Sequence, residues 1–111
     1  SFTSESNSMS AAAIMSFVYG VLSIVGGFIG YQQAGSKPSL ISGTITGILL
    51  LVAGFGILQA QVWGLWLAIA VTLLLVTVFI VRLVKTRKFF PAGLMVAVGI
   101  GTLIVLFKGI G

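Results

Sequence analysis

The stretch Gly26–Gly47, GGFIGYQQAGSKPSLISGTITG, decides the fold of this 111-residue chain. It ends one apolar segment, passes through a short polar turn with a single lysine, Lys37, and begins a second apolar segment at Pro38. The same pattern returns in VFIVRLVKTRKFFPAGLMVAVGIG, Val78–Gly101, where Pro91 begins the second segment. Proline is tolerated in the first turn of a helix, because the N–H that it lacks has no partner there. The two copies predict two helical hairpins.

The composition excludes a water-soluble domain. Hydrophobic residues make up 59% of the chain and charged residues 6%, and the mean hydropathy is +1.26. Soluble domains contain about 25% charged residues. The chain has no cysteine, no histidine and a single acidic residue, Glu5, which removes thiol, imidazole and carboxylate-pair chemistry and the usual metal and haem ligands. We therefore expect a membrane protein that is not an enzyme and that holds no metal and no cofactor.

Four apolar segments follow a polar, serine-rich tail, 1–10, which we expect to be disordered. About 20 apolar residues are needed to cross a hydrocarbon core of about 30 Å. The predicted spans are 11–31, 39–58, 63–81 and 91–107, within a single transmembrane domain, 11–108. The short connections make neighbouring helices antiparallel. The expected fold is an all-α membrane protein, a four-helix transmembrane bundle of two parallel-repeat hairpins with glycine-rich packing faces.

The cations are distributed unequally between the two ends of this bundle. The first and third connections contain Lys37, Arg82, Lys85, Arg87 and Lys88, whereas the other end has only Lys108. Short loops rich in Lys and Arg stay on the cytoplasmic side of a membrane or its topological equivalent. We therefore expect the basic loops on that side and both termini on the opposite side.

Small residues recur four positions apart, as they do where membrane helices pack closely. The predicted helix-packing residues are Gly26, Gly30, Gly43, Gly47, Gly93 and Gly101. The preferred interpretation is tight packing within one bundle, and the alternative is a homo-oligomer formed through one of these ridges.

No Asp, Glu, Lys, Arg or His lies inside a predicted span, so an ion-coupling site is not indicated. The remaining polar groups there are hydroxyls, and most Ser and Thr hydroxyls in helices bond to the carbonyl one turn back. Tyr19 and Thr44 are the candidates for a polar groove between helices. For Tyr19 a hydrogen bond across the bundle is preferred over contact with a ligand.

The basic end is the one positive signal for binding. The second and fourth helices begin there, so their N-terminal dipole ends would act together with Lys37, Arg87 and Lys88. Such a surface attracts an anion, for example a fatty-acid carboxylate or a lipid phosphate. The alternative is that the cations only set topology and contact headgroups. Arg82 and Lys85, at the C-terminal end of the third helix, fit its dipole without a further reason.

Two stretches, GFIGYQQAGSKPSLISG (Gly27–Gly43) and RLVKTRKFFPAGLM (Arg82–Met95), resemble the transmembrane protein 14 family. The resemblance implies a bundle of four hydrophobic helices, with one amphipathic helix as an alternative, and no established catalytic motif. It implies a plastid or mitochondrial membrane, or a bacterial inner or thylakoid membrane. It also implies fatty-acid export for plant members and handling of porphyrin precursors for animal members.

The function expected from residues and resemblance together is passive transport or flipping of a hydrophobic anion, with free fatty acids as the first choice. Transport of porphyrin precursors is one alternative. A structural or accessory subunit of a larger membrane complex is another. The expected partners are membrane lipids and free fatty acids, with a homo-oligomer or a larger membrane complex as open alternatives, and no nucleic acid is expected.

Overall fold

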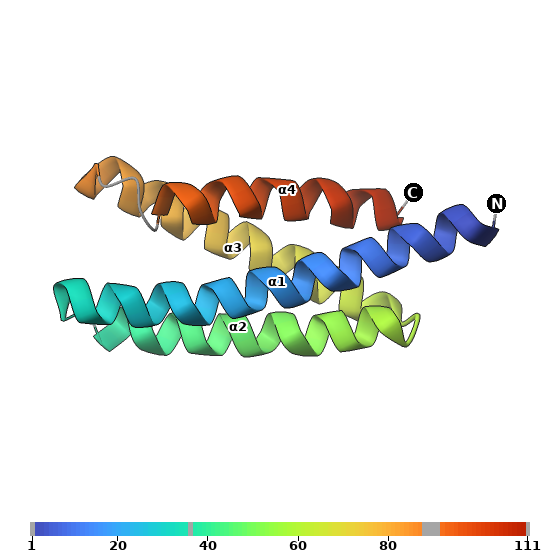
Figure 1. Cartoon of the computed structure of the whole chain (residues 1–111), viewed down its shortest axis with the longest axis horizontal. Coiled ribbons are helices and arrows are strands. Elements are labelled where there is room, and N and C mark those ends of the chain that lie inside the picture. The colour runs from blue at the N-terminus through green and yellow to red at the C-terminus, as the bar shows by residue number, and fades with distance from the viewer. Residues whose placement is uncertain (1, 36, 88–91, 111) are drawn as a thin grey trace.

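The computed structural model describes residues 2–35, 37–87 and 92–110, and this part of the chain consists of four α-helices without strands. Helix α1 covers Phe2–Ala34, α2 Lys37–Leu58, α3 Val62–Thr86 and α4 Ala92–Ile110. The molecule measures 47 × 21 × 16 Å, and the helices lie along its long axis (Figure 1). The all-helical architecture predicted from the sequence is confirmed.

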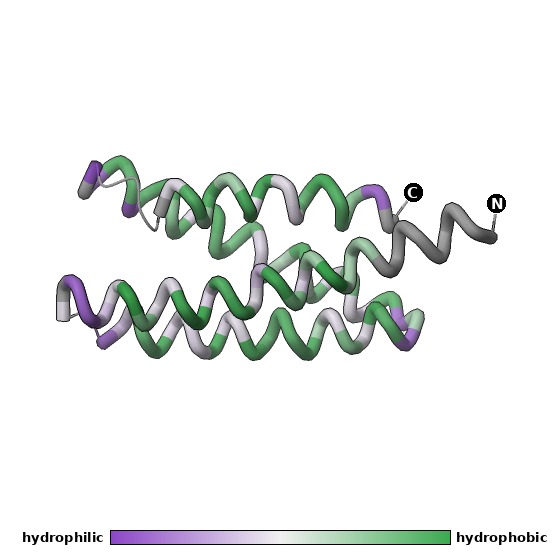
Figure 2. The backbone as a smooth tube through the Cα atoms, in the orientation of Figure 1, coloured by the Kyte–Doolittle hydropathy of each residue, from purple (hydrophilic) through white to green (hydrophobic). Residues whose placement is uncertain are grey.

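Three of the helices are long and apolar enough to cross a membrane, over Ala11–Gln33, Lys37–Leu58 and Val62–Lys85. Large apolar side chains are exposed on their outer surfaces, among them Phe55 at 59% and Trp66 at 56%. In Figure 2 the hydrophobic residues, in green, make up most of each helix. Soluble proteins do not expose apolar surface on this scale. The chain is therefore an integral membrane protein. The fourth apolar segment, Gly93–Lys108, is shorter, and a complete crossing by α4 stays a prediction.

The largest differences from the expected helix boundaries lie before the first span and beyond the third. α1 continues back to Phe2, whereas the sequence predicts a disordered tail over 1–10; this segment contains no Gly or Pro that would end a helix begun in the apolar span. α2 begins at Lys37, so Pro38 stands in its first turn, as predicted. Pro91, the second helix-start proline, lies outside the described residues.

The third helix does not end at Val81, as expected, but continues to Thr86 and includes Arg82 and Lys85. Arg87 ends it in the left-handed conformation, at φ 56°, and its N–H donates to the carbonyl oxygen of Leu83. A helix commonly ends with one left-handed residue of this kind. As a result, Arg82 stands one turn inside the helix and not in a loop.

Helices α1 and α3 run in one direction and α2 and α4 in the opposite one (Figure 1). Consecutive helices pack against each other, and α1 also packs against α4, which closes a ring of four. Both termini lie at one end of the bundle, and the end of α3 lies with the start of α2 at the other (Figure 1). The antiparallel arrangement of neighbours is confirmed, whereas a symmetry that relates the two hairpins stays a prediction.

Glycines allow α1 and α2 to approach each other closely. A Cβ atom added to Gly27 would lie 3.1 Å from the Cα atom of Gly43, and one added to Gly20 would lie 2.9 Å from the carbonyl oxygen of Gly47. Beside these glycines the hydroxyls of Ser23 and Thr46 are hydrogen-bonded, 3.0 Å apart. Small residues and hydroxyl bonds are the means by which helices associate in lipid, where burial of apolar surface provides little driving force.

A tight turn brings α3 back along α2. Ala60 adopts a left-handed conformation at φ 58°, its N–H donates to Ile57, and the N–H of Gln61 donates to Gly56. The Trp63 ring covers Gly56, where an added Cβ atom would lie 2.7 Å from it. The turn therefore fixes α3 against the end of α2 at the same end of the bundle as the termini.

Candidate functional site

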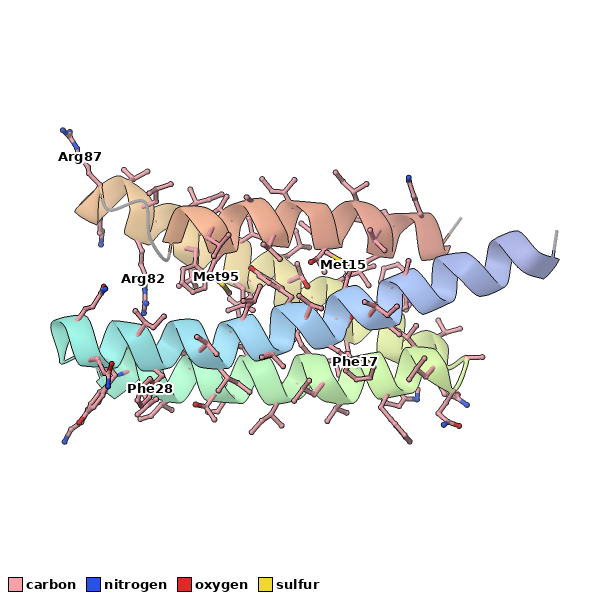
Figure 3. All side chains as sticks on the ribbon, viewed as in Figure 1. Met15, Phe17, Phe28, Arg82, Arg87 and Met95 are labelled. Atoms are coloured by element: carbon pink, nitrogen blue, oxygen red, sulfur yellow. The ribbon has the colours of Figure 1, made fainter. Side chains whose placement is uncertain are left out.

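Four of the five described cations gather at the end of the bundle where α3 ends and α2 begins: Lys37, Arg82, Lys85 and Arg87; the fifth, Lys108, is in the last turn of α4 at the opposite end. Lys88, which the sequence places with them, lies outside the described residues. Lys37, Lys85 and Arg87 are exposed, whereas Arg82 is half-buried. In Figure 3 the Arg87 side chain points away from the bundle, and that of Arg82 points from α3 toward α1.

Arg82 contacts residues of two other helices. Its Nη1 atom donates a hydrogen bond to the Oγ atom of Ser39 on α2, a residue that is 2% exposed. On α1, a Cβ atom added to Gly30 would lie 2.8 Å from Ser39 Oγ and 3.8 Å from Arg82 Nη1. Within α3, the Arg82 guanidinium carbon lies 5.7 Å from the centroid of the Phe79 ring, a cation–π geometry. We call Gly30, Ser39, Phe79 and Arg82 the Arg82 site.

The position of Arg82 follows from the periodicity of α3. Phe79 and Arg82 are three residues apart and therefore share a face of the helix, whereas Val81, Val84 and Lys85 are exposed. The sequence interpretation grouped Arg82 with Lys85 as charges at a helix end; the structure separates them, because only Arg82 lies on the face that carries buried Phe79. Extending the inward face of α3 beyond Val81 would have revealed this difference.

One face of α1 connects the Arg82 site with the middle of the bundle. At spacings of three and four this face carries Gly30, Gly26, Ser23, Tyr19 and Ser16. All but Gly30, which is half-buried, are buried. At 1.5 Å per residue, Tyr19 lies about 16 Å along the helix from Gly30. This depth is about half the thickness of a hydrocarbon core.

Gly26 lies between these two levels and meets α3 and α4. A Cβ atom added there would lie 3.8 Å from the Met95 sulfur and 3.9 Å from the Phe79 ring, which are ordinary contact distances. Met95 is 1% exposed and Phe79 5%. Figure 3 shows Met95 on α4 directed into the bundle. Because methionine is unbranched and flexible, it can adapt its conformation at this position.

Tyr19 is fully buried, and its ring reaches across the bundle to two other helices. A Cβ atom added to Gly99 of α4 would lie 2.6 Å from the Tyr19 hydroxyl oxygen and 2.4 Å from a methyl carbon of Val76 on α3. The expected hydrogen bond across the bundle is wrong for the described residues: the Tyr19 hydroxyl is buried and none of them is its hydrogen-bond partner. The hydroxyls of Ser16 and Thr72 are also buried and have no hydrogen-bond partner among the described residues.

Other hydroxyls bond within their helices, as predicted. Thr46 donates to the carbonyl of Ser42, Thr77 to that of Leu73 and Thr102 to that of Val98. Thr44, the second candidate for a polar groove, is half-buried on α2, whereas the described contacts of Tyr19 are on α3 and α4.

The predicted packing glycines have different environments. Gly43 and Gly47 contact α1, but the glycines that they meet there are Gly27 and Gly20. Gly26 and Gly30 instead adjoin Met95 and the Arg82 site, and Gly93 is half-buried. An added Cβ atom at Gly101 would meet nothing within 4 Å, so this position does not pack against another described helix.

An apolar hollow of about 320 Å³ lies on the surface of α1 and is lined by Phe17, Val18, Val21 and Leu22. It offers hydrocarbon contact only. No group of three or more His, Cys, Asp or Glu side chains that could hold a metal ion occurs among the described residues.

An apolar helical bundle with most of its cations at one end defines a small polytopic α-helical membrane protein. The chain belongs to the transmembrane protein 14 family: the sequence profile described as "Transmembrane proteins 14C" matches residues 15–106. It is 39% identical over 95 residues to Protein FATTY ACID EXPORT 5 of Arabidopsis thaliana, with 80% of this chain and 78% of that protein covered. It is 38% identical over 98 residues to Transmembrane protein 14C of Bos taurus, with 86% and 82% covered.

A further relative, Protein FATTY ACID EXPORT 4, chloroplastic, of Arabidopsis thaliana, is 35% identical over 95 residues, and this chain spans 53% of its length. No solved structure matches the chain.

Proposed function

We propose that this protein mediates passive transport or flipping of free fatty acids across its membrane. The observation that carries the proposal is the position of Arg82, half-buried between α1, α2 and α3 and hydrogen-bonded to Ser39. An arginine in such a place is not needed to set topology, because exposed cations do that equally well. A guanidinium matches the geometry of a carboxylate better than any other side chain.

The exposed cations at the same end, Lys37, Lys85 and Arg87, increase the local concentration of anions at the membrane surface. Arg82 would then receive the carboxylate, while the hydrocarbon tail stays in lipid. The names of two plant relatives, Protein FATTY ACID EXPORT 5 and 6, support a fatty acid as the substrate. The hydrocarbon surface beside the cation favours an amphipathic acid over a small inorganic anion.

From Arg82 the inward face of α1 leads past Gly26, where an added Cβ atom would meet the flexible Met95 side chain only at an ordinary contact distance. The segments 11–31, 39–81 and 92–107 contain no Asp, Glu, Lys, Arg or His. Because an ion-coupled transporter needs such groups within the membrane, the movement would follow the concentration gradient of the acid. The proposed orientation has the Arg82 end on the cytoplasmic-equivalent side and the termini opposite, with α4 as a fourth crossing.

The test is fatty-acid movement into proteoliposomes that contain trapped albumin, measured with radiolabelled palmitic acid against protein-free vesicles. We expect saturable, protein-dependent movement. The rate should fall about tenfold in Arg82→Gln, because this variant loses a charge-assisted hydrogen bond to the carboxylate. Lys85→Gln is the matched control, since it removes an exposed charge from the same helix end. Equal movement with and without protein would refute the proposal.

A second candidate, a homo-oligomer or an accessory subunit of a larger complex, rests on a separate observation. Gly101 faces open space, and Ala97, four residues before it, is exposed on α4. Small residues at this spacing admit another helix. Extraction of the protein into native nanodiscs would reveal a stoichiometric partner. The Gly101→Leu variant should be extracted without that partner, because the larger side chain would block the helix contact.

A further inference from the structure

We infer that the hydroxyls of Ser16, Tyr19 and Thr72 form a site in the middle of the bundle that takes the head group of a fatty acid as the neutral carboxylic acid. This inference rests on the proposed function and specifies the chemical form in which the substrate crosses. It predicts that each acid crosses together with one proton and without net charge.

The first argument is the unsatisfied state of the three hydroxyls. Each belongs to a residue that is 0% exposed, and none has a hydrogen-bond partner among the described residues. A buried hydroxyl without a partner costs free energy, and native structures rarely retain three of them without water or a ligand. Other buried hydroxyls in the bundle, those of Ser23, Thr46 and Thr102, in contrast have hydrogen bonds.

The second argument is the similar level of the three hydroxyls along the bundle. The Tyr19 hydroxyl lies where α1, α3 and α4 meet, beside Val76 and Gly99. Ser16 precedes Tyr19 by three residues and Thr72 precedes Val76 by four, and because α1 and α3 run in the same direction, both are displaced toward the end with the termini (Figure 1). Thr102, three residues beyond Gly99 on the antiparallel α4, is displaced the same way. It is fully buried, and its oxygen can still accept a hydrogen bond.

The third argument is electrostatic. Hydroxyls both donate and accept, as does a neutral carboxyl group, whereas a carboxylate only accepts and brings a charge. The segments 11–31, 39–81 and 92–107 contain no cation that could balance that charge at the depth of Tyr19. A lone charge at the centre of a membrane is strongly unfavourable. The head group is therefore suited to Arg82 when it is a carboxylate, and to the three hydroxyls when it is a neutral carboxylic acid.

The proton balance is simple. A carboxylate at Arg82 takes a proton from water at that end, leaves the guanidinium, and moves as the neutral acid past Met95 to the three hydroxyls. At the opposite surface it gives the proton to water. In the structure the Tyr19 hydroxyl fills the space beside Gly99, so the ring must turn or α4 must shift for a head group to pass.

The test separates charge movement from acid movement. Proteoliposomes with radiolabelled palmitic acid, a pH-sensitive dye and a potassium diffusion potential of about 100 mV report both quantities. We expect one proton delivered per acid and a protein-dependent rate that does not change with the potential. An anion that crossed half of this potential would change its rate about sevenfold.

Variants connect this readout to the site. Tyr19→Phe keeps the ring and removes an unpartnered hydroxyl, so the thermal stability of the bundle should be unchanged or higher while the protein-dependent rate falls about threefold to tenfold. Tyr31→Phe, at the exposed end of α1, is its control. Ser16→Ala with Thr72→Val should act in the same direction, with Thr77→Val as the control on the exposed face of α3.

Movement that depends on the potential, or that is unaffected by the Tyr19 and Ser16–Thr72 variants, would overturn the inference while Arg82-dependent movement still upheld the proposed function. Loss of stability in Tyr19→Phe together with an unchanged rate would show a purely structural role and overturn it as well.

Discussion

Arg82 on α3 donates a hydrogen bond to Ser39 on α2, and Gly30 of α1 lies against both residues. This contact joins three helices at the cationic end of the bundle. An added Cβ atom at Gly30 would lie 2.8 Å from the Ser39 hydroxyl oxygen, so this hydroxyl would have to shift. The same arrangement therefore serves packing and, in the proposed function, the capture of a carboxylate.

A double-mutant cycle tests whether this contact is energetically coupled. We expect Ser39→Ala and Arg82→Gln each to lower the free energy of unfolding, with a coupling energy of about 1 kcal/mol, since hydrogen bonds to charged groups contribute about 1.5–3 kcal/mol and the half-buried guanidinium is partly solvated. Thermal unfolding in nanodiscs measures it. Lys85→Gln is the control, and a coupling of zero would mean that the hydrogen bond does not stabilise the bundle.

Glycine substitutions should separate the packed helix face from the open one. Gly27→Ala places a Cβ atom 2.7 Å from the Ser39 carbonyl oxygen and 3.1 Å from Gly43 Cα, both backbone atoms that cannot move aside separately. We expect a loss of about 1–3 kcal/mol in stability, the usual cost of overpacking. Gly101→Ala, which faces open space, should be neutral or stabilising. Equal effects at the two positions would contradict the described α1–α2 contact.

The turn between α2 and α3 offers a gain in stability. Ala60 has a φ of 58°, in the left-handed region where a Cβ atom is unfavourable. Ala60→Gly should therefore raise the free energy of unfolding by about 1 kcal/mol. Gly35, at φ 64°, is the reciprocal position, and Gly35→Ala should lower it. The prediction fails if the melting temperatures of the two variants shift in the same direction.

Gly26 tests the route from Arg82 to the middle of the bundle. An added methyl group would lie 3.8 Å from the Met95 sulfur, so Gly26→Ala should fold normally, but it narrows the face along which the head group would pass. We expect unchanged stability and a severalfold lower protein-dependent rate of fatty-acid movement. Gly101→Ala provides the matched glycine control. An unchanged rate in Gly26→Ala would place the route elsewhere.

Much of the fold follows from the sequence, because in lipid the backbone must bond within each helix, and apolar length then identifies the helices. The hairpin turn at Lys37–Pro38 and the short connections were sufficient to predict antiparallel neighbours. The pairing of Gly27 with Gly43 was not predictable, since α1 has small residues on several faces and only the packed bundle selects Gly20 and Gly27 over Gly26.

The candidate site was predicted in its general position and not in its details. The excess of cations indicated one end of the bundle, but the boundary drawn at Val81 placed Arg82 in a loop and hid that it shares the inward face with Phe79. For Tyr19 the partner could not be predicted. The length of its side chain made a hydrogen bond across the bundle plausible, but Gly99 and Val76, beside which its hydroxyl lies, have no side-chain hydrogen-bonding groups.

The most direct measurement of the central claim is the distance between a bound carboxylate and Arg82. The chain contains two arginines, so in the Arg87→Lys variant guanidinium ¹⁵N labels report Arg82 alone. With ¹³C-carboxyl palmitic acid in nanodiscs, dipolar recoupling by solid-state NMR should give a carbon–nitrogen distance of about 4 Å, as in a carboxylate–guanidinium pair. Saturable binding of palmitic acid without any coupling to the Arg82 guanidinium would contradict the account.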